Sequence, residues 1–180
     1  MIRVDLSRCT GCRRCEAACA FFHTGRINPE MARLKVLHLY EIGVDGPVVC
    51  QQCQERYCMV CPEDALSLGS RGEVVCSPTL CTLCGACEKS CPIGAVTQFQ
   101  GFVYICDLCG GDPKCVKACT ERAIVCEEGE RPSFKELRKA TRGMNPQERR
   151  HVFLSRLGER LREEWKARGE AGEGRDLSEA

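Results

Sequence analysis

The sequence predicts an α+β chain in which one small unit is repeated four times and is followed by a helical extension. Three observations support this class. Sixteen of the 18 cysteines fall into four groups of four, and short aliphatic runs typical of β-strands flank these groups. Beyond Glu127 the cysteines end and charged residues become frequent. A unit repeated in fixed order indicates stacked copies of one supersecondary element.

The most regular cysteine group, motif three, spans residues 81–92 and reads C-x2-C-x2-C-x3-C-P. Bacterial ferredoxins bind [4Fe–4S] clusters with this run, the first three thiolates holding one cluster and the fourth holding a neighbouring one. Two-residue gaps let a loop present three sulfurs to three irons. The next helical turn aims the fourth cysteine away, and Pro92 ends that turn.

The other three motifs are variants of this run. Motif one keeps gaps of two, two and three residues, whereas the gaps are two, four and two in motif two and two, five and three in motif four. Together the motifs predict four [4Fe–4S] clusters and 16 cysteine ligands. The ligands are Cys9, Cys12, Cys15 and Cys19 (motif one), Cys50, Cys53, Cys58 and Cys61 (motif two), Cys81, Cys84, Cys87 and Cys91 (motif three), and Cys106, Cys109, Cys115 and Cys119 (motif four).

The segments between the motifs predict the strands in order. Ala20 stands where the run usually has proline, so the helix of motif one can continue through Phe22. Asp45, Gly46 and Pro47 predict a turn. Strands are expected at residues 2–6, 33–42, 73–75 and 102–105, and at the aliphatic residues that follow Ala65, Ala95 and Ala123.

The charged C-terminal region is expected to form two helices. Ser133 and Glu136 have the spacing of a capping box for a short helix. Asn145, Pro146 and Glu148 predict the start of a longer one, which should end near Arg168. Residues 170–180 are polar and small, which predicts a frayed tail. Four apolar residues recur at helical spacing, and we expect this stripe to bind a partner: Leu154, Leu157, Leu161 and Trp165.

Composition argues against other uses of the cysteines. A secreted disulfide scaffold needs an apolar leader, which the first residues lack, so a cytoplasmic location is expected. Structural zinc sites usually show two C-x-x-C pairs separated by a longer loop, whereas here three cysteines fall within seven residues twice. No stretch approaches the roughly 20 apolar residues of a membrane helix.

The formal charge of +1 also needs correction for bound clusters. Sixteen thiolates and four oxidised cores would bring the protein to about −7. Nucleic-acid binding is therefore not expected.

Two cysteines and three histidines lie outside the motifs. Cys76 and Cys126 fall on strands beside motifs three and four, and the simplest interpretation is that both are small buried residues packed near the clusters. His23, His38 and His151 are expected to be surface or packing residues rather than cluster ligands.

The four motifs and their order resemble the four-cluster electron-transfer subunits that accompany molybdenum and tungsten enzymes and hydrogenases. Three further elements carry the resemblance: F-H-x-G-R-x-N-P at residues 22–29, C-Q-Q-C at 50–53 and C-D-L-C-G-G-D at 106–112. Over residues 1–128 the chain looks like the small ferredoxin-like subunit of tungsten aldehyde oxidoreductase-type complexes. The resemblance implies two bacterial dicluster ferredoxin-like units, one inserted in the other. The outer unit would be residues 1–43 and 100–128, the inner unit 44–99, and the helical extension 129–180.

The resemblance also implies which motifs share clusters, whereas spacing alone leaves pairing of consecutive motifs open. Motif two departs from the family, because only Met59 and Val60 separate its last two cysteines where three residues are usual. This shift turns Cys61 by about a third of a helical turn. Carried over, the ligand sets are Cys9, Cys12, Cys15 and Cys119 (cluster 1), Cys106, Cys109, Cys115 and Cys19 (cluster 2), Cys50, Cys53, Cys58 and Cys91 (cluster 3), and Cys81, Cys84, Cys87 and Cys61 (cluster 4).

The function implied by this resemblance is a non-catalytic electron conduit within a hetero-oligomer. Single electrons would pass between a catalytic subunit with a tungsten or molybdenum cofactor and a ferredoxin or flavoprotein partner. Alternatives are an electron-transfer subunit of a hydrogenase or formate dehydrogenase and a free polyferredoxin that docks transiently. A structural zinc protein is a further alternative, which a brown colour would exclude.

Overall fold

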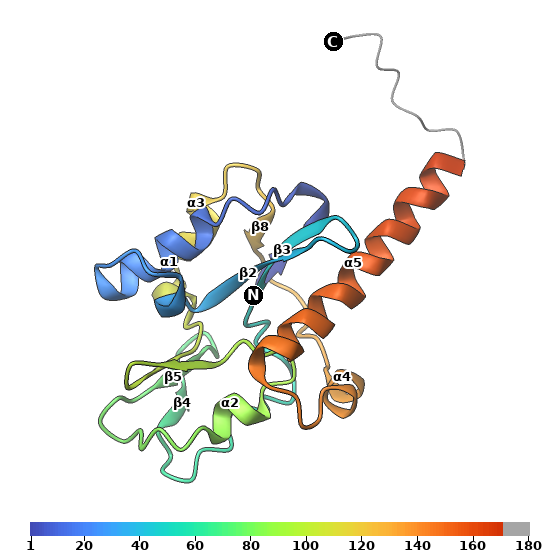
Figure 1. The fold of residues 1–180 in the computed structure, drawn as a ribbon. Coiled ribbons are helices and arrows are strands. Elements are labelled where there is room, and N and C mark those ends of the chain that lie inside the picture. Colours follow the sequence, from blue (N-terminus) through green and yellow to red (C-terminus); the bar gives the residue numbers. More distant parts are fainter. Residues whose placement is uncertain (171–180) are drawn as a thin grey trace.

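The computed structural model describes residues 1–170, and the strands in that range form four separate antiparallel pairs (Figure 1). β1 pairs with β8, β2 with β3, β4 with β5 and β6 with β7. Every predicted strand is present, which confirms the α+β class. The strands are β1 (Ile2–Val4), β2 (Leu34–Leu39), β3 (Val44–Val49), β4 (Leu66–Leu68), β5 (Val74–Cys76), β6 (Thr97–Phe99), β7 (Phe102–Tyr104) and β8 (Ile124–Cys126).

Short helices follow the loops of motifs one, three and four. They are α1 (Arg14–Thr24), α2 (Ala86–Ser90) and α3 (Lys114–Ala118), with single 3-10 turns η1 (Leu6–Arg8), η2 (Pro29–Met31) and η3 (Leu108–Gly111). α1 continues past Cys19 as predicted, because Ala20 keeps the backbone N–H that a proline would lack. It ends at Gly25, whose positive φ and N–H bond to the Phe21 carbonyl close the helix.

The turn predicted at residues 45–47 is wrong. The chain reverses at residues 40–43, and residues 45–47 lie within β3, paired with β2. Gly46 is required for packing, because a Cβ there would lie 2.9 Å from Cδ1 of Leu154 and also clash with Leu6. The glycine therefore lets two side chains approach a strand instead of permitting a turn.

Two hydrophobic cores lie beneath the four strand pairs. The first joins β1, α1, β2 and β8 and includes Ile2, Ala20, Leu34, Val36, Tyr104 and Ile124. The second joins the middle of the chain to the C-terminal helices and includes Leu39, Val48, Leu66, Val74, Val96, Ile105, Leu137 and Leu154. Cysteines of the motifs take part in both cores, so the thiols form a substantial share of the interior.

The C-terminal region forms α4 (Lys135–Ala140) and α5 (Pro146–Glu170). The capping box of α5 is confirmed: the Asn145 N–H donates to Glu148, and the Glu148 N–H donates back to Asn145, at 2.8 and 2.9 Å. The capping box of α4 is wrong, because the Ser133 hydroxyl donates to Glu55 and α4 begins after Phe134. Residues 171–180 of the predicted tail lie outside the described residues. In the described part of the chain, no helix combines the length and apolar character needed to cross a bilayer.

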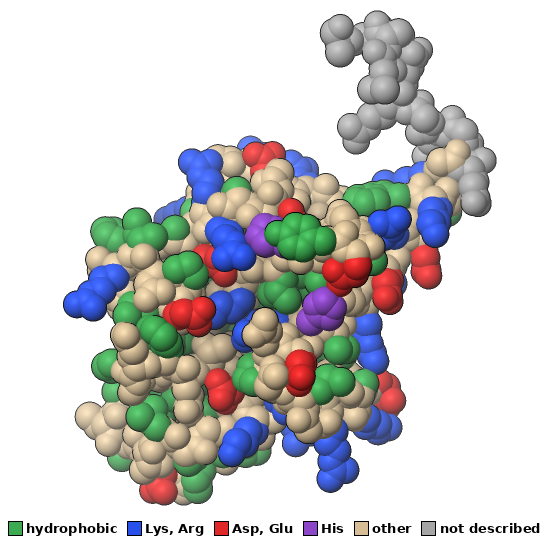
Figure 2. Space-filling view, in the orientation of Figure 1, with side chains coloured by type: hydrophobic (Ala, Val, Ile, Leu, Met, Phe, Trp, Pro, Cys, Tyr) green, Lys and Arg blue, Asp and Glu red, His purple; other side chains and the backbone are tan. Residues whose placement is uncertain are grey.

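The first half of α5 packs on its own chain, which corrects part of the expected partner face. Leu154 is fully buried in the second core, and Leu157 packs against that core. Gly158 permits the contact, because a Cβ there would lie 2.6 Å from Cδ1 of Ile42. Leu161 is only partly buried and Trp165 is 43% exposed. The second half of α5 runs away from the strand pairs (Figure 1). Side chains of both charges cover that half (Figure 2).

Candidate metal centres

Site one lies between the motif-one loop and the end of α3. The thiols of Cys9, Cys12, Cys15 and Cys119 line one small cavity, together with Ile124 of β8. Burial raises the pKa of Cys9, and the neighbouring Cys119 and Cys12 thiols add to that increase. The cysteine from motif four is thus beside the first three of motif one.

Site two lies where α1 packs against α3. Burial raises the pKa of Cys106 to about 12, and the nearby Cys19 and Cys109 thiols contribute. Burial also raises the pKa of Cys115, which has Cys106, Cys19 and Cys109 as thiol neighbours. Cys19 of motif one therefore lies beside the thiols of motif four, as Cys119 lies beside those of motif one.

Site three combines motif two with the last cysteine of motif three. Burial raises the pKa of Cys58 to about 12, with Cys91 and Cys53 as its first thiol neighbours. Burial raises the pKa of Cys50 as well, and Cys91 and Cys58 are among its neighbours. Four thiols from two motifs again come together.

Site four contains one thiol more than the predicted set. Its cavity is lined by Cys61, Cys76, Cys81, Cys84 and Cys87. Cys61 reaches this group despite the short gap in motif two. Cys76 was expected only to pack nearby, but it lines the same cavity, whereas Cys126 is exposed and its predicted burial is wrong.

Thiols of successive sites also neighbour one another. Cys15 of site one has Cys115 of site two among its neighbours, Cys50 of site three has Cys106 of site two, and Cys58 of site three has Cys87 of site four. The sites therefore follow one another in the order one, two, three, four. Among the 16 motif cysteines, the exposed ones are Cys12 and Cys84, in the two terminal sites.

Backbone N–H groups point at three of the fourth-position sulfurs. Ala95 donates to Sγ of Cys91 at 3.3 Å, and Ala123 donates to Sγ of Cys119 at 3.2 Å. Both donors stand four residues after their cysteine. In motif one the extension of α1 displaces this position, and Arg33, just before β2, donates to Sγ of Cys19 at 3.3 Å instead. The residues between α1 and β2 thus bring a backbone N–H to the fourth cysteine of motif one, as Ala95 and Ala123 do in motifs three and four.

A glutamate after the third cysteine ties two motifs to their outgoing strands. Glu16 is buried and accepts from the Val36 N–H at 2.7 Å. Glu88 accepts from the Gln98 N–H at 2.9 Å. Val36 stands three residues after Arg33, and Gln98 three residues after Ala95, the two N–H donors to sulfur. Sequence reasoning missed this pair, although the repeated Cys-Glu dipeptide in motifs one and three was a visible signal.

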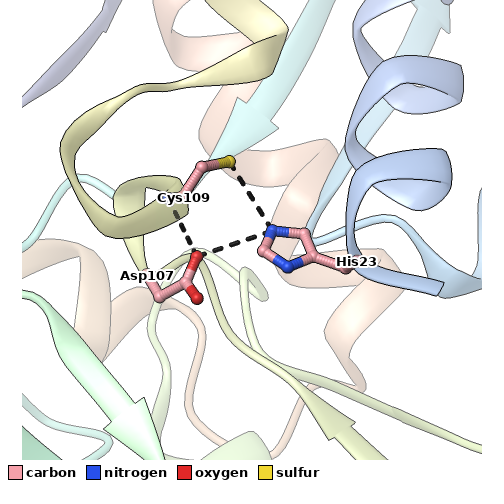
Figure 3. A group of neighbouring side chains, drawn as sticks. All are labelled: His23, Asp107 and Cys109. Carbon is pink, nitrogen blue, oxygen red and sulfur yellow. Dashed lines mark hydrogen bonds and ion pairs between the residues drawn. The ribbon is translucent and has the colours of Figure 1, made fainter.

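His23 lies beside a ligand candidate, which sequence reasoning did not anticipate. Its Nε2 is 3.6 Å from Sγ of Cys109 and 3.5 Å from Oδ1 of Asp107 (Figure 3). The same Asp107 accepts from the Cys109 N–H and pairs with Arg33 at 2.5 Å. α1 brings the histidine over site two, because the helix continues beyond Cys19.

The C-terminal extension contacts site three directly. Arg149 of α5 is buried, and its Nη1 donates to the carbonyls of Glu88, Lys89 and Cys91 at 3.2, 2.5 and 3.0 Å. The Thr141 hydroxyl donates to the Pro92 carbonyl at 3.2 Å. The segment that carries Cys91 is therefore held by residues far along the chain. No local pattern in the sequence indicates this contact.

The four thiol groups fit iron–sulfur clusters by their donor chemistry. Each site offers at least four sulfurs from two motifs, and N–H donors reach sulfurs at sites one, two and three. Burial raises the pKa of many of these thiols, so a bound cation is needed to hold them as thiolates near neutral pH. Sites made of four cysteine thiolates hold [4Fe–4S] clusters, and zinc is the other common occupant.

Comparison with known proteins favours iron–sulfur chemistry. Residues 1–27 and residues 77–97 each match a family described as a 4Fe-4S binding domain. These segments contain motif one and motif three.

Similar proteins include two oxidoreductase chains and a putative electron transport protein. The chain is 42% identical over 124 residues to the polyferredoxin-like subunit of an aliphatic sulfonate oxidoreductase from Pyrococcus furiosus, covering 67% of this chain and 71% of that protein. It is 32% identical over 154 residues to the putative electron transport protein YsaA of Escherichia coli, covering 76% and 95%. It is 29% identical over 144 residues to one of the chains of the anaerobic dimethyl sulfoxide reductase of Escherichia coli, covering 67% and 69%.

Proposed function

Because the chain belongs to the family of polyferredoxin-like electron-transport proteins, we propose that it relays single electrons through four [4Fe–4S] clusters in a row. The observation that carries the proposal is the sequence of neighbouring thiols from site one to site four. The terminal sites have the exposed cysteines, so electrons would enter at one end and leave at the other.

The proposed ligands are the 16 motif cysteines in the four sets implied by the resemblance. At every site the thiol neighbours agree with exchange between motifs one and four and between motifs two and three.

Bound clusters supply reversible one-electron chemistry. The chain's own residues hold the sulfurs, keep water from the inner sites and set the reduction potentials. An N–H donated to a ligand sulfur stabilises the more negative, reduced state and raises the potential. Arg33, Ala95 and Ala123 supply such donors, and His23 lies close enough to Cys109 to act in the same way.

We also propose the two nested units as the domain arrangement: an outer unit of residues 1–43 and 100–128, an inner unit of residues 44–99, and the extension of residues 129–180. The pairing of β1 with β8 closes the outer unit, and the pairing of β4 with β5 lies wholly within the inner one. The two hydrophobic cores follow the same division in large part. The pairs β2–β3 and β6–β7 each join one unit to the other across the proposed boundaries.

The chain would work with a catalytic subunit in a hetero-oligomer. The proposal is supported by two relatives whose names describe them as a subunit of an oxidoreductase and as a chain of a reductase. We propose a tungsten or molybdenum cofactor on that subunit and a ferredoxin or flavoprotein at the other end. The partner contact would include Leu161 and Trp165. Trp165 shares a surface groove with Ser7, Arg8 and Thr10, next to Cys9 of site one.

A freely diffusing polyferredoxin remains the second candidate, and one observation favours it. Leu154 and Leu157 of the apolar stripe on α5 pack within the chain, and Leu154 is fully buried. Little of the stripe is therefore left to bind a permanent partner.

Metal analysis tests the cluster count. Anaerobically purified protein should contain about 16 irons and 16 acid-labile sulfides per chain. A reproducible value near eight at full occupancy would show that two sites do not hold clusters. Stoichiometric zinc in a colourless protein would refute the electron-transfer function.

Isolation of the native protein under anaerobic conditions tests the partner. A catalytic subunit retained at high salt, with tungsten or molybdenum in the same fraction, would support the permanent complex. Recovery of the chain alone at both low and high salt would favour the free carrier.

A further inference from the structure

Cys76 occupies a position in site four that has a direct counterpart in site one. Cys76 precedes Cys81 by five residues and pairs with Leu66, which follows Cys61 by five. In site one, Val4 precedes Cys9 by five residues and pairs with Ile124, which follows Cys119 by five. The repeat therefore places a thiol over site four where it places a valine over site one.

The surroundings of Cys76 direct its thiol toward the other cysteines of the site. It ends β5, and the turn that follows brings Cys81 back, with the Cys81 N–H donating to the Ser77 carbonyl at 3.2 Å. Cys76 lines the same small cavity as Cys61, Cys81 and Cys87, and Cys81 is its foremost thiol neighbour. Cys76 and Cys81 also both line a larger cavity beside β5 and β7. The two thiols thus lie together at the edge of the site.

We propose that Cys76 is an alternative thiolate ligand of site four, which can take the place of Cys81 on the same iron. The proposal rests on the four-cluster function and names a ligand beyond the 16. In the exchange, the bond from iron to Sγ of Cys81 breaks and a bond to Sγ of Cys76 forms. The proton leaves Cys76 and is taken by Cys81, so charge and electron count are unchanged. The site can therefore keep its cluster when Cys81 is lost.

The test compares iron and sulfide content and electron paramagnetic resonance spectra of anaerobically purified full-length variants. Cys81→Ala should keep about 16 irons per chain, with an altered spectrum for one reduced cluster. Cys76→Val restores the site-one pattern and should also keep about 16. The double variant Cys81→Ala/Cys76→Val should lose about four irons or show an oxidised three-iron signal. Cys84→Ala is the matched control within motif three and should behave like the double variant.

Loss of the cluster in Cys81→Ala alone, to the level of Cys84→Ala, would overturn the proposal. Retention of about 16 irons in the double variant would also overturn it, because neither thiol would then be needed. Loss of a cluster in Cys76→Val alone would make Cys76 an obligatory ligand and refute the exchange. Failure of the four-cluster function is recognised separately, by a wild-type protein that itself holds fewer than about 16 irons.

Discussion

The contact between Arg149 and the Cys91 segment leads to a prediction about how the clusters are retained. Arg149 is 6% exposed, and its Nη1 lies within 3.2 Å of three backbone carbonyls around the end of α2. Arg149→Met keeps an unbranched apolar side chain and removes the donors. The carbonyls of Glu88, Lys89 and Cys91 would then lose this partner, and that of Cys91 is buried.

The cost can be worked from these bonds. Hydrogen bonds to a charged group contribute about 1.5–3 kcal/mol each. One Nη1 carries two hydrogens and serves two carbonyls fully, so we expect the segment to be destabilised by about 3 kcal/mol. Every 1.4 kcal/mol is tenfold in an equilibrium constant, so local opening around Cys91 should become roughly 100-fold more frequent. Because the fold holds several metal sites, a single free energy of unfolding is not a suitable readout.

The rate of iron release to a chelator under anaerobic conditions measures this opening. Arg149→Met should release about one quarter of the iron, that of site three, on a distinctly faster phase. Arg156→Met, on the exposed side of the same helix, is the control and should release iron at the wild-type rate. Deletion of residues 130–180 removes Arg149 and Thr141 together, and should produce at least as large an effect. If Arg149→Met and the control are indistinguishable, the buried guanidinium does not hold the segment and the reasoning is wrong.

Three further predictions concern separate parts of the chain. His23→Phe should lower the reduction potential of one cluster, because a donor near Cys109 is lost, whereas His23→Gln should largely keep it. A redox titration followed by electron paramagnetic resonance would show whether the potential moves. Reconstitution of the apoprotein with iron and sulfide should accelerate between pH 7 and pH 9, since burial raises the pKa of Cys58 and Cys106 to about 12 and iron binds the thiolate. A rate of colour development independent of pH would contradict this. Gly158→Leu should lift the second half of α5 from Ile42 and expose it to trypsin with the iron content unchanged, whereas Gly169→Ala, with open space around it, should not.

Features governed by local sequence were predictable. The strands other than β3, the continuation of α1 beyond Ala20 and the reciprocal cap of Asn145 and Glu148 each depend on residues within a few positions. The repeat helped, because motifs two, three and four are each followed by an alanine and an aliphatic residue at the start of a strand region. These are places where local preference and the final fold agree.

Features that depend on residues far apart were not predictable. Gly46 looked like a turn residue, but its role is set by Leu6 and Leu154, which the fold brings against β3. Cys76 was expected to pack beside the clusters. Its place in site four depends on the register of β4 with β5, which the sequence alone does not show. Nothing in the sequence distinguishes Arg149 from the other charged residues of α5. Its buried position follows from docking of the helix, which composition does not reveal.

The nested repeat also explains how the row of sites is held together. α1 carries Cys15 and Cys19, so one helix joins sites one and two. The segment from Cys58 to Cys61 joins sites three and four in the same way. No motif contributes cysteines to both site two and site three. Between these two sites, the buried Gln52 side chain donates to the Cys106 carbonyl at 3.0 Å. The chain itself therefore links site one to site two and site three to site four. The link between sites two and three depends on side-chain hydrogen bonds and on the strand pairs β2–β3 and β6–β7. In the proposed ligand sets, exchange of the fourth cysteines would join the sites in two pairs, and these few contacts would connect the two pairs.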